Sequence, residues 1–158
     1  MSCSGDLAYS ANMLLVLDPV FEKVEFAITD YNIPGFEIGL IIQSFSGAQI
    51  KTQGESIVFN PLQFSMILDK EFTTYEKIYN YLIDRVDPES TVFRPRQSKT
   101  QATIVINSNK KNPLAKFIYH DMIITGLGDI DLSKADSKTI LKAPITAEYT
   151  WMEFKRIE

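Results

Sequence analysis

The chain has 158 residues, a length that suits one domain able to bury a core without disulfides or metal. Its 45% hydrophobic and 11% aromatic content is typical of a folded globular chain, and its net charge of -4 argues against a dedicated nucleic-acid binder. The single cysteine, Cys3, excludes an internal disulfide and a multi-cysteine metal site.

The amino-terminal residues 1–12 are small and polar, and we expect a flexible segment there. A single domain is expected over residues 13–158. It begins with the apolar run Met13–Leu17, which has no basic region before it and is far too short for a bilayer, which needs about 20 apolar residues. We therefore predict a strand, or a segment that docks on a neighbour, and no membrane segment.

Two strands are predicted next. The stretch 23–31 alternates apolar and polar residues, as a half-buried strand does, and the turn formers of 32–35 end it. The second strand, Phe36–Phe45, has a nearly continuous apolar middle at 38–42. Such a strand is either covered within its own sandwich or reserved in part for another subunit.

The stretch from Gln43 to Ser56 is polar, with glycines at 47 and 54, and is typical of a long hairpin or a mobile loop. Phe45 and Ile50 are apolar residues in this otherwise polar tip. They indicate either a subunit contact or packing within the hairpin itself.

The stretch Phe59–Leu82 organises the rest of the chain. It begins with an alternating strand up to Asp69 whose core face carries Leu62, Phe64, Met66 and Leu68. Thr73 stands three residues before Glu76, the spacing of a capping box, so a helix is predicted to start there. Asp87-Pro88 is predicted to end it. Its apolar stripe is expected to be Tyr75, Ile78, Tyr79, Leu82 and Val86.

The remainder is also β-type. A polar connector over 88–100 leads to a strand at 101–107, a turn at 107–113 and a return strand at 115–124 with Phe117, Tyr119 and Asp121 on one face. A single long strand over 143–157 is expected to lie deep in a sheet. The predicted fold is therefore mainly β, an antiparallel β-sandwich or partly closed barrel with one flanking α-helix.

The sequence offers no constellation for catalysis. His120 and Asp121 are adjacent in a strand and point to opposite faces. The acidic stretch 129–133 begins like a calcium loop, but Lys134 and Ile140 occupy the required glycine and glutamate positions. Gly126 and Gly128 lack the third glycine of a dinucleotide fingerprint. We expect no enzyme, no catalytic residue, no metal site and no cofactor.

Several short stretches together resemble the tail-tube-like structural proteins of contractile-tailed bacteriophages. The resemblance covers roughly residues 13–158. It rests on the order of these stretches: 33–39, 57–62, 66–72, 75–82, 102–106 and 108–113.

This resemblance implies a tail-tube-like fold and a structural virion protein of a contractile tail, either of the tube or of the baseplate hub that initiates it. It implies self-assembly into a hexameric ring, with a trimer as the alternative, and contacts with other phage tail or baseplate proteins. Location in the virion tail after synthesis in the host cytoplasm follows from it. It leaves open the non-specific passage of DNA through a lumen.

In that family the insertion at 43–56 is implied to reach an adjacent subunit or ring. The residues expected at the subunit interface are Ile41, Ile42, Phe45, Gln49 and Ile50. The alternative function is a monomeric assembly chaperone or binding module that covers the edge strand of a partner.

Overall fold

A computed structural model describes residues 13–17, 28–84, 100–108, 112–135 and 139–157. This part of the chain is mainly β, with antiparallel sheets and one helix, which confirms the predicted fold class. Its elements are β1 (Met13–Leu17), β2 (Ile28–Tyr31), β3 (Phe36–Phe45), β4 (Ala48–Phe59), β5 (Leu62–Ile67), α2 (Thr73–Ile83), β6 (Thr100–Asn107), β7 (Pro113–Leu127), β8 (Lys142–Glu148) and β9 (Trp151–Arg156).

Parts of several predictions lie outside the described residues. These parts are the amino-terminal segment 1–12, the start of the strand predicted at 23–31, Val86 of the predicted helix stripe, most of the connector 88–100 and the middle of the turn 107–113. The helix α2 ends at Ile83, with Asp84 as its C-cap residue, so the prediction that Asp87-Pro88 ends it is wrong.

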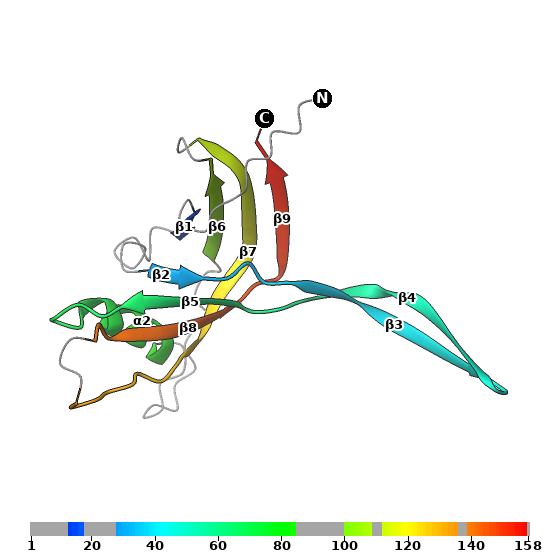
Figure 1. The fold of residues 1–158 in the computed structure, drawn as a ribbon, viewed down its shortest axis with the longest axis horizontal. Helices are drawn as coiled ribbons and strands as arrows, with labels where there is room; N and C mark the ends of the chain where they lie inside the picture. The colour runs from blue at the N-terminus through cyan, green and yellow to red at the C-terminus, as the bar shows by residue number, and fades with distance from the viewer. Residues whose placement is uncertain (1–12, 18–27, 85–99, 109–111, 136–138, 158) are drawn as a thin grey trace.

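Strand β7 belongs to two groups of strands and joins them into one body. Its first half pairs with β6 and β9, and β1 continues that group beyond β6. Its second half pairs with β8, followed by β5 and β2. The two groups cross at a steep angle, with β7 passing through both (Figure 1). Because β7 bends where it passes from one group to the other, the sheet curves around its own apolar face.

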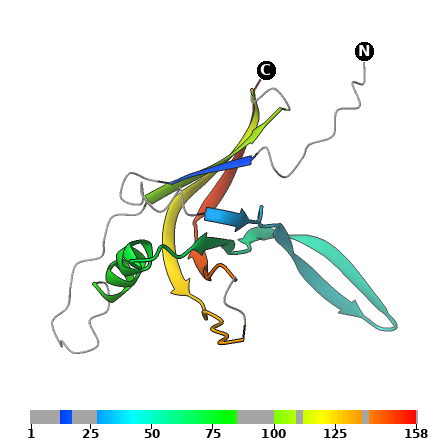
Figure 2. The ribbon, with the colours of Figure 1, turned by 60° about the vertical axis from the view of Figure 1, so that its left-hand side comes forward.

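The core fills the space inside this bend. Alternate residues of β5, β6 and β8 point into it, and the helix α2 lies beside the lower half of β7 (Figure 2). The predicted core face of β5 is confirmed, since Leu62 and Met66 are fully buried, Phe64 nearly so and Leu68 in part. Ala102 and Ile104 of β6 are also fully buried. This burial supplies the main favourable contribution to folding.

The amino-terminal end of α2 differs from the predicted capping box. Phe72, with φ of 55°, is the N-cap residue, and Thr73 is already helical. The carboxylate of Asp69 accepts hydrogen bonds from the backbone N–H of Thr73 and of Thr74, both at 3.2 Å. The prediction that Thr73 caps the helix is wrong because an acidic side chain four residues earlier already satisfies the free amides of the first turn.

The buried stripe of α2 is also shifted from the predicted one. Thr74, Ile78 and Tyr81 are the buried residues, whereas the side chain of Tyr79 is 48% exposed. Tyr75 and Leu82 pack against the core only in part. The spacing of 74, 78 and 81 is equally helical, so periodicity alone did not choose between the two stripes.

We predict that Asp69→Ala lowers the stability of the fold, because it leaves the first-turn amides without their acceptor. The hydroxyls of Thr73 and Thr74, as hydrogen-bond donors, hold the pKa of Asp69 well below its ordinary value. The stabilisation is therefore complete above the ordinary carboxyl pKa of about 4 and is lost as the pH falls toward the folded-state pKa. Urea unfolding at pH 7 and below pH 4 should show a difference from wild type that shrinks at the lower pH.

Asp69→Asn is the matched control, since its amide oxygen can still accept from one of the two first-turn N–H groups that the two carboxylate oxygens bind. It should be less destabilising than Asp69→Ala at pH 7. Equal destabilisation by the alanine and asparagine variants would contradict the capping role.

The face pattern of β7 changes at Asp121, where φ is 56°. The prediction placed Tyr119 and Met122 on opposite faces, yet both are fully buried. A left-handed residue within the strand shifts the alternation by one position, as a β-bulge does. The predicted opposition of these two side chains is therefore wrong.

The predicted single strand over 143–157 is in fact two strands. Strand β8 ends at Glu148 and β9 begins at Trp151, and the backbone N–H of Thr150 donates to the carbonyl of His120 between them. Strand β8 lies inside the sheet, but β9 has β7 as its one strand neighbour among the described elements. The expectation that this whole stretch lies deep in a sheet is wrong for β9, because the chain crosses from one group of strands to the other.

Candidate subunit interface

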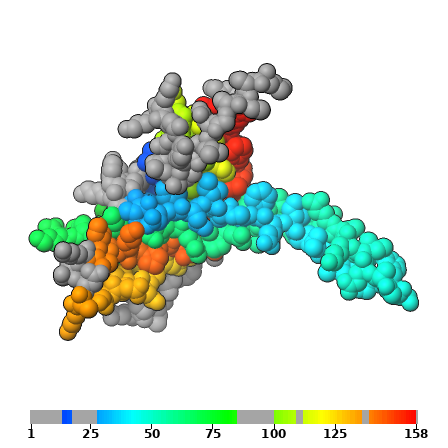
Figure 3. Space-filling view, in the orientation of Figure 1, coloured from blue at the N-terminus to red at the C-terminus, as the bar shows by residue number. Residues whose placement is uncertain are grey.

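Strands β3 and β4 form a long two-stranded hairpin that projects from the body of the molecule (Figures 1 and 3). We call residues 36–59 the arm. Its two strands turn at Ser46-Gly47, and Gly47 adopts a φ of 86° that suits glycine. Of the two structures predicted for 43–56, the hairpin is confirmed and the mobile loop is wrong.

The arm exposes an unusual number of large apolar side chains. It carries nine of the nineteen that are exposed among the described residues. Leu40 is 65% exposed and Phe45 59%. The alternative that β3 is buried within its own sandwich is therefore wrong. The nine are Phe36, Ile38, Leu40, Ile41, Ile42, Phe45, Ile50, Ile57 and Val58.

The pairing of β3 with β4 divides the five predicted interface residues between two faces. Directly opposed residues of an antiparallel pair point to the same side. Gln43 is opposite Ile50 and Phe45 opposite Ala48, so Ile41, Phe45 and Ile50 share one face. Ile42, opposite Lys51, and Gln49, opposite Ser44, lie on the other face together with Leu40. Both faces of the arm carry exposed apolar side chains.

A shift in the pairing marks the midpoint of the arm. Ile38 is opposite Ile57, whereas Leu40 is opposite Gln53, so β4 contains two additional residues there. The backbones approach closely at this point, because a Cβ atom on Gly54 would lie 2.5 Å from the carbonyl oxygen of Gly39. Glycine is thus required at position 54 for this approach.

The root of the arm is tied to the core by a series of aromatic rings. Phe36 contacts Phe59 at a centroid distance of 5.9 Å, and Phe59 contacts Tyr149 at 5.7 Å. Tyr149 in turn meets the fully buried Tyr119 edge-on at 4.9 Å. The arm is therefore fixed at its base while its distal part extends into solvent.

The sequence missed the root of the arm as part of this surface. Phe36, Ile38, Ile57 and Val58 are all exposed, and Phe36 and Ile38 were assigned to a strand that could equally have been buried. The signal available in the sequence was the nearly continuous apolar run at 38–42, since a strand that packs one face on its own core alternates apolar with polar.

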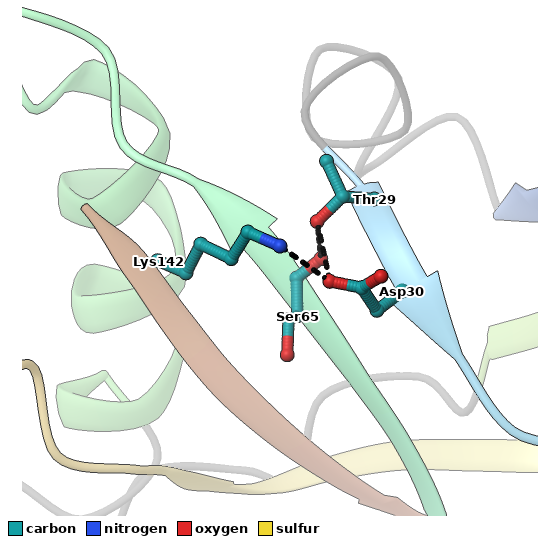
Figure 4. A network of polar contacts seen from close by, with 4 residues as sticks. All are labelled: Thr29, Asp30, Ser65 and Lys142. Carbon is teal, nitrogen blue, oxygen red and sulfur yellow. Dashed lines mark hydrogen bonds and ion pairs between the residues drawn. The ribbon is translucent and has the colours of Figure 1, made fainter. Parts of the chain in front are cut away.

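An open groove of about 490 Å³ lies across β2, β5 and β8. The Nζ of Lys142 donates to the Oδ2 of Asp30 at 2.7 Å, and the hydroxyl of Thr29 donates to the same oxygen at 3.1 Å (Figure 4). Lys142 and Thr29 hold the pKa of Asp30 below its ordinary value. Since the pair is exposed, it contributes little to stability.

His120 contacts a carboxylate of β9 rather than that of the adjacent Asp121. Its Nε2 lies 3.3 Å from the Oε2 of Glu153, and its ring stacks on Trp151 at a centroid distance of 3.9 Å. Hydrogen bonds to Lys155, the larger cause, and to His120 lower the pKa of Glu153 below its ordinary value.

No group of three metal-ligating side chains occurs in the described residues. The described helix is too short and too polar to cross a membrane.

The fold matches chains in solved structures of contractile injection particles. A chain of the anti-feeding prophage cap has a TM-score of 0.69 at 12% identity, covering 99% of this chain and 100% of that one. A chain of the anti-feeding prophage baseplate has a TM-score of 0.68 at 12% identity, covering 99% and 98%. A chain of the sheath-tube complex of an extracellular contractile injection system in the extended state has a TM-score of 0.66 at 11% identity, covering 99% of each.

These matches confirm the tail-tube-like fold that the sequence resemblance implied. No family model and no curated protein matches the sequence.

Proposed function

We propose that this protein is a structural subunit of the tube, cap or baseplate of a contractile, tail-like particle and acts by self-assembly rather than by catalysis. The observation that carries the proposal is the match of the fold over nearly the whole chain to chains of such particles. The exposed arm supports it, because an isolated two-stranded hairpin with apolar faces is marginal in water and requires cover.

Within that class, we place the protein in the tail of a contractile bacteriophage, as a tube component or as a hub component that initiates the tube. Copies join into a ring, six-fold in a tube and three-fold in a hub. The arm contributes Ile41, Ile42, Phe45, Gln49 and Ile50 to subunit contacts. Strands β2 and β9 each have one strand neighbour in the described part of the chain and are our candidates for edge pairing between copies.

The same exposed edges favour one alternative function. A monomeric assembly chaperone or binding module could use a free strand edge to pair with a strand of a partner protein. This alternative requires no contact between copies of this chain.

Light scattering of the purified protein over a range of concentrations, combined with negative-stain imaging, separates the two functions. We expect the mass to rise to that of a closed ring, or of stacked rings, as the concentration increases. A monomer at every concentration would contradict self-assembly and favour the chaperone.

A further inference from the structure

The charges of the arm are divided between its two halves at the pairing shift. Lys51 is the one charged residue between Leu40 and Gln53. The root half, on the other side of the shift, carries Glu37 and Glu55. All three side chains are exposed. Glu37 and Lys51 have no ion-pair partner among the described residues. The distal half is therefore cationic and the root half anionic.

Both halves also need apolar cover. The distal half exposes Leu40, Ile41, Ile42, Phe45 and Ile50, and the root half exposes Phe36, Ile38, Ile57 and Val58. By contrast, the outward residues of the neighbouring β2–β5–β8 surface are largely polar, among them Asp30, Gln63, Ser65 and Thr146. A second arm matches the first in length and carries exposed apolar side chains in both of its halves.

From this complementarity we infer that the distal half of one arm packs on the root half of the arm of a second copy. The inference rests on the proposed self-assembly and names the contact that drives it. Lys51 of one copy then lies near Glu37 and Glu55 of the next. Each arm covers the root of one neighbour and is covered by the tip of the other.

Because the tip and the root of each arm contact two different neighbours, this arrangement is heterologous. Repeating it leads to a closed ring or to an open filament, whereas two arms that covered each other reciprocally would stop at an isologous dimer. The arrangement also accounts for apolar side chains in both halves of the arm, because both halves are used at once. The close approach of Gly39 and Gly54 lies between the two contact regions.

Charge exchange tests the pairing. We expect Lys51→Glu, and separately the double variant Glu37→Lys/Glu55→Lys, to raise the concentration at half assembly by about three- to tenfold, with a smaller effect at high salt. The triple variant that carries all three substitutions should recover most of the loss. If the triple variant is no better than the worse of its two parents, the pairing of tip with root is overturned.

Cysteine cross-linking gives an independent measurement. In a Cys3→Ser background, one variant carries Ile42→Cys, on the face of Lys51, and a second carries Val58→Cys, on the face of Glu37. Mixing the two should produce a disulfide-linked dimer under mild oxidation, and neither variant alone should do so to a comparable extent. Cross-linking of Ile42→Cys mainly with itself would overturn the tip-to-root contact.

These tests distinguish failure of the inference from failure of the proposed function. A wild-type protein that remains monomeric at all concentrations contradicts both self-assembly and the arm contact. A wild-type protein that forms rings, in which neither the charge variants nor the cysteine pair behaves as described, leaves self-assembly standing and overturns only the arm contact.

Discussion

Tyr119→Ala is expected to destabilise the fold by about 3–5 kcal/mol, the range typical of removing a buried aromatic side chain. Tyr119 is fully buried in β7, the strand shared by both groups of strands. Its ring packs edge-on against Tyr149, which belongs to the series of rings reaching the root of the arm. The loss is a large fraction of the roughly 5–15 kcal/mol that stabilises a typical domain. Urea unfolding followed by circular dichroism measures it.

Tyr119→Phe is the control that separates packing from hydrogen bonding. The phenolic oxygen is buried without a hydrogen-bond partner in the described part of the chain. Removing it keeps the ring and relieves an unsatisfied polar atom, so stability should be unchanged or higher by up to about 1 kcal/mol. A loss comparable to that of the alanine variant would show that the hydroxyl is bonded in the folded protein.

The same residue gives a pH dependence. Burial raises the pKa of Tyr119 above its ordinary value, so the folded state disfavours the ionised phenol. The unfolded chain loses this proton near pH 10 and the folded chain only at higher pH, so stability falls as the pH rises above about 10. Burial also raises the pKa of Tyr31 and of Tyr149 to about 12. Tyr119→Phe should therefore reduce the alkaline loss without abolishing it.

The second large effect concerns assembly. We expect the double variant Phe45→Glu/Ile50→Glu to weaken self-association by at least about a hundredfold, because burying each large apolar side chain is worth about 1.5–3 kcal/mol and a charge cannot take its place. Both side chains lie on the same face of the arm and are exposed in the monomer, at 59% and 49%. The stability of the monomer should therefore remain within about 0.5 kcal/mol of wild type.

Light scattering reports the loss of assembly, and thermal unfolding reports the integrity of the monomer. The matched control is Phe45→Leu/Ile50→Val, which keeps both positions apolar and should assemble within a few-fold of wild type. Normal assembly of the glutamate variant would remove this face of the arm from the interface. A glutamate variant that does not fold would instead place these side chains in a core.

Most strands of this protein could be predicted from the sequence because their alternation is local. In β5, Leu62, Phe64 and Met66 recur at every second position, and one buried face is sufficient to produce that pattern. The helix was also predicted from its apolar spacing. Its cap was not, because the spacing of Thr73 and Glu76 indicated a capping box and the sequence does not show that the side chain of Asp69 reaches the free amides.

The tertiary structure decided where the alternation breaks. At Asp121 a left-handed residue shifts the pattern of β7, and at Tyr149-Thr150 the chain passes from β8 to β9. The sequence alternates through Tyr149-Thr150 without a break. At Asp121 it places two adjacent polar residues, His120 and Asp121, between Tyr119 and Met122, but residue type alone does not show which face each one occupies. These two points lie beside each other, as Thr150 donates to the carbonyl of His120.

For the candidate interface, too, one part could be predicted from the sequence and the other part was decided by the tertiary structure. The sequence alone determined that 36–45 is a strand too apolar for a simple half-exposed position, and it singled out Phe45 and Ile50 at the tip. Only the tertiary structure decided that this strand leaves the body as an arm with two exposed faces. The physical reason is that an apolar residue signals a need for cover, while the chain that supplies the cover is fixed by long-range geometry.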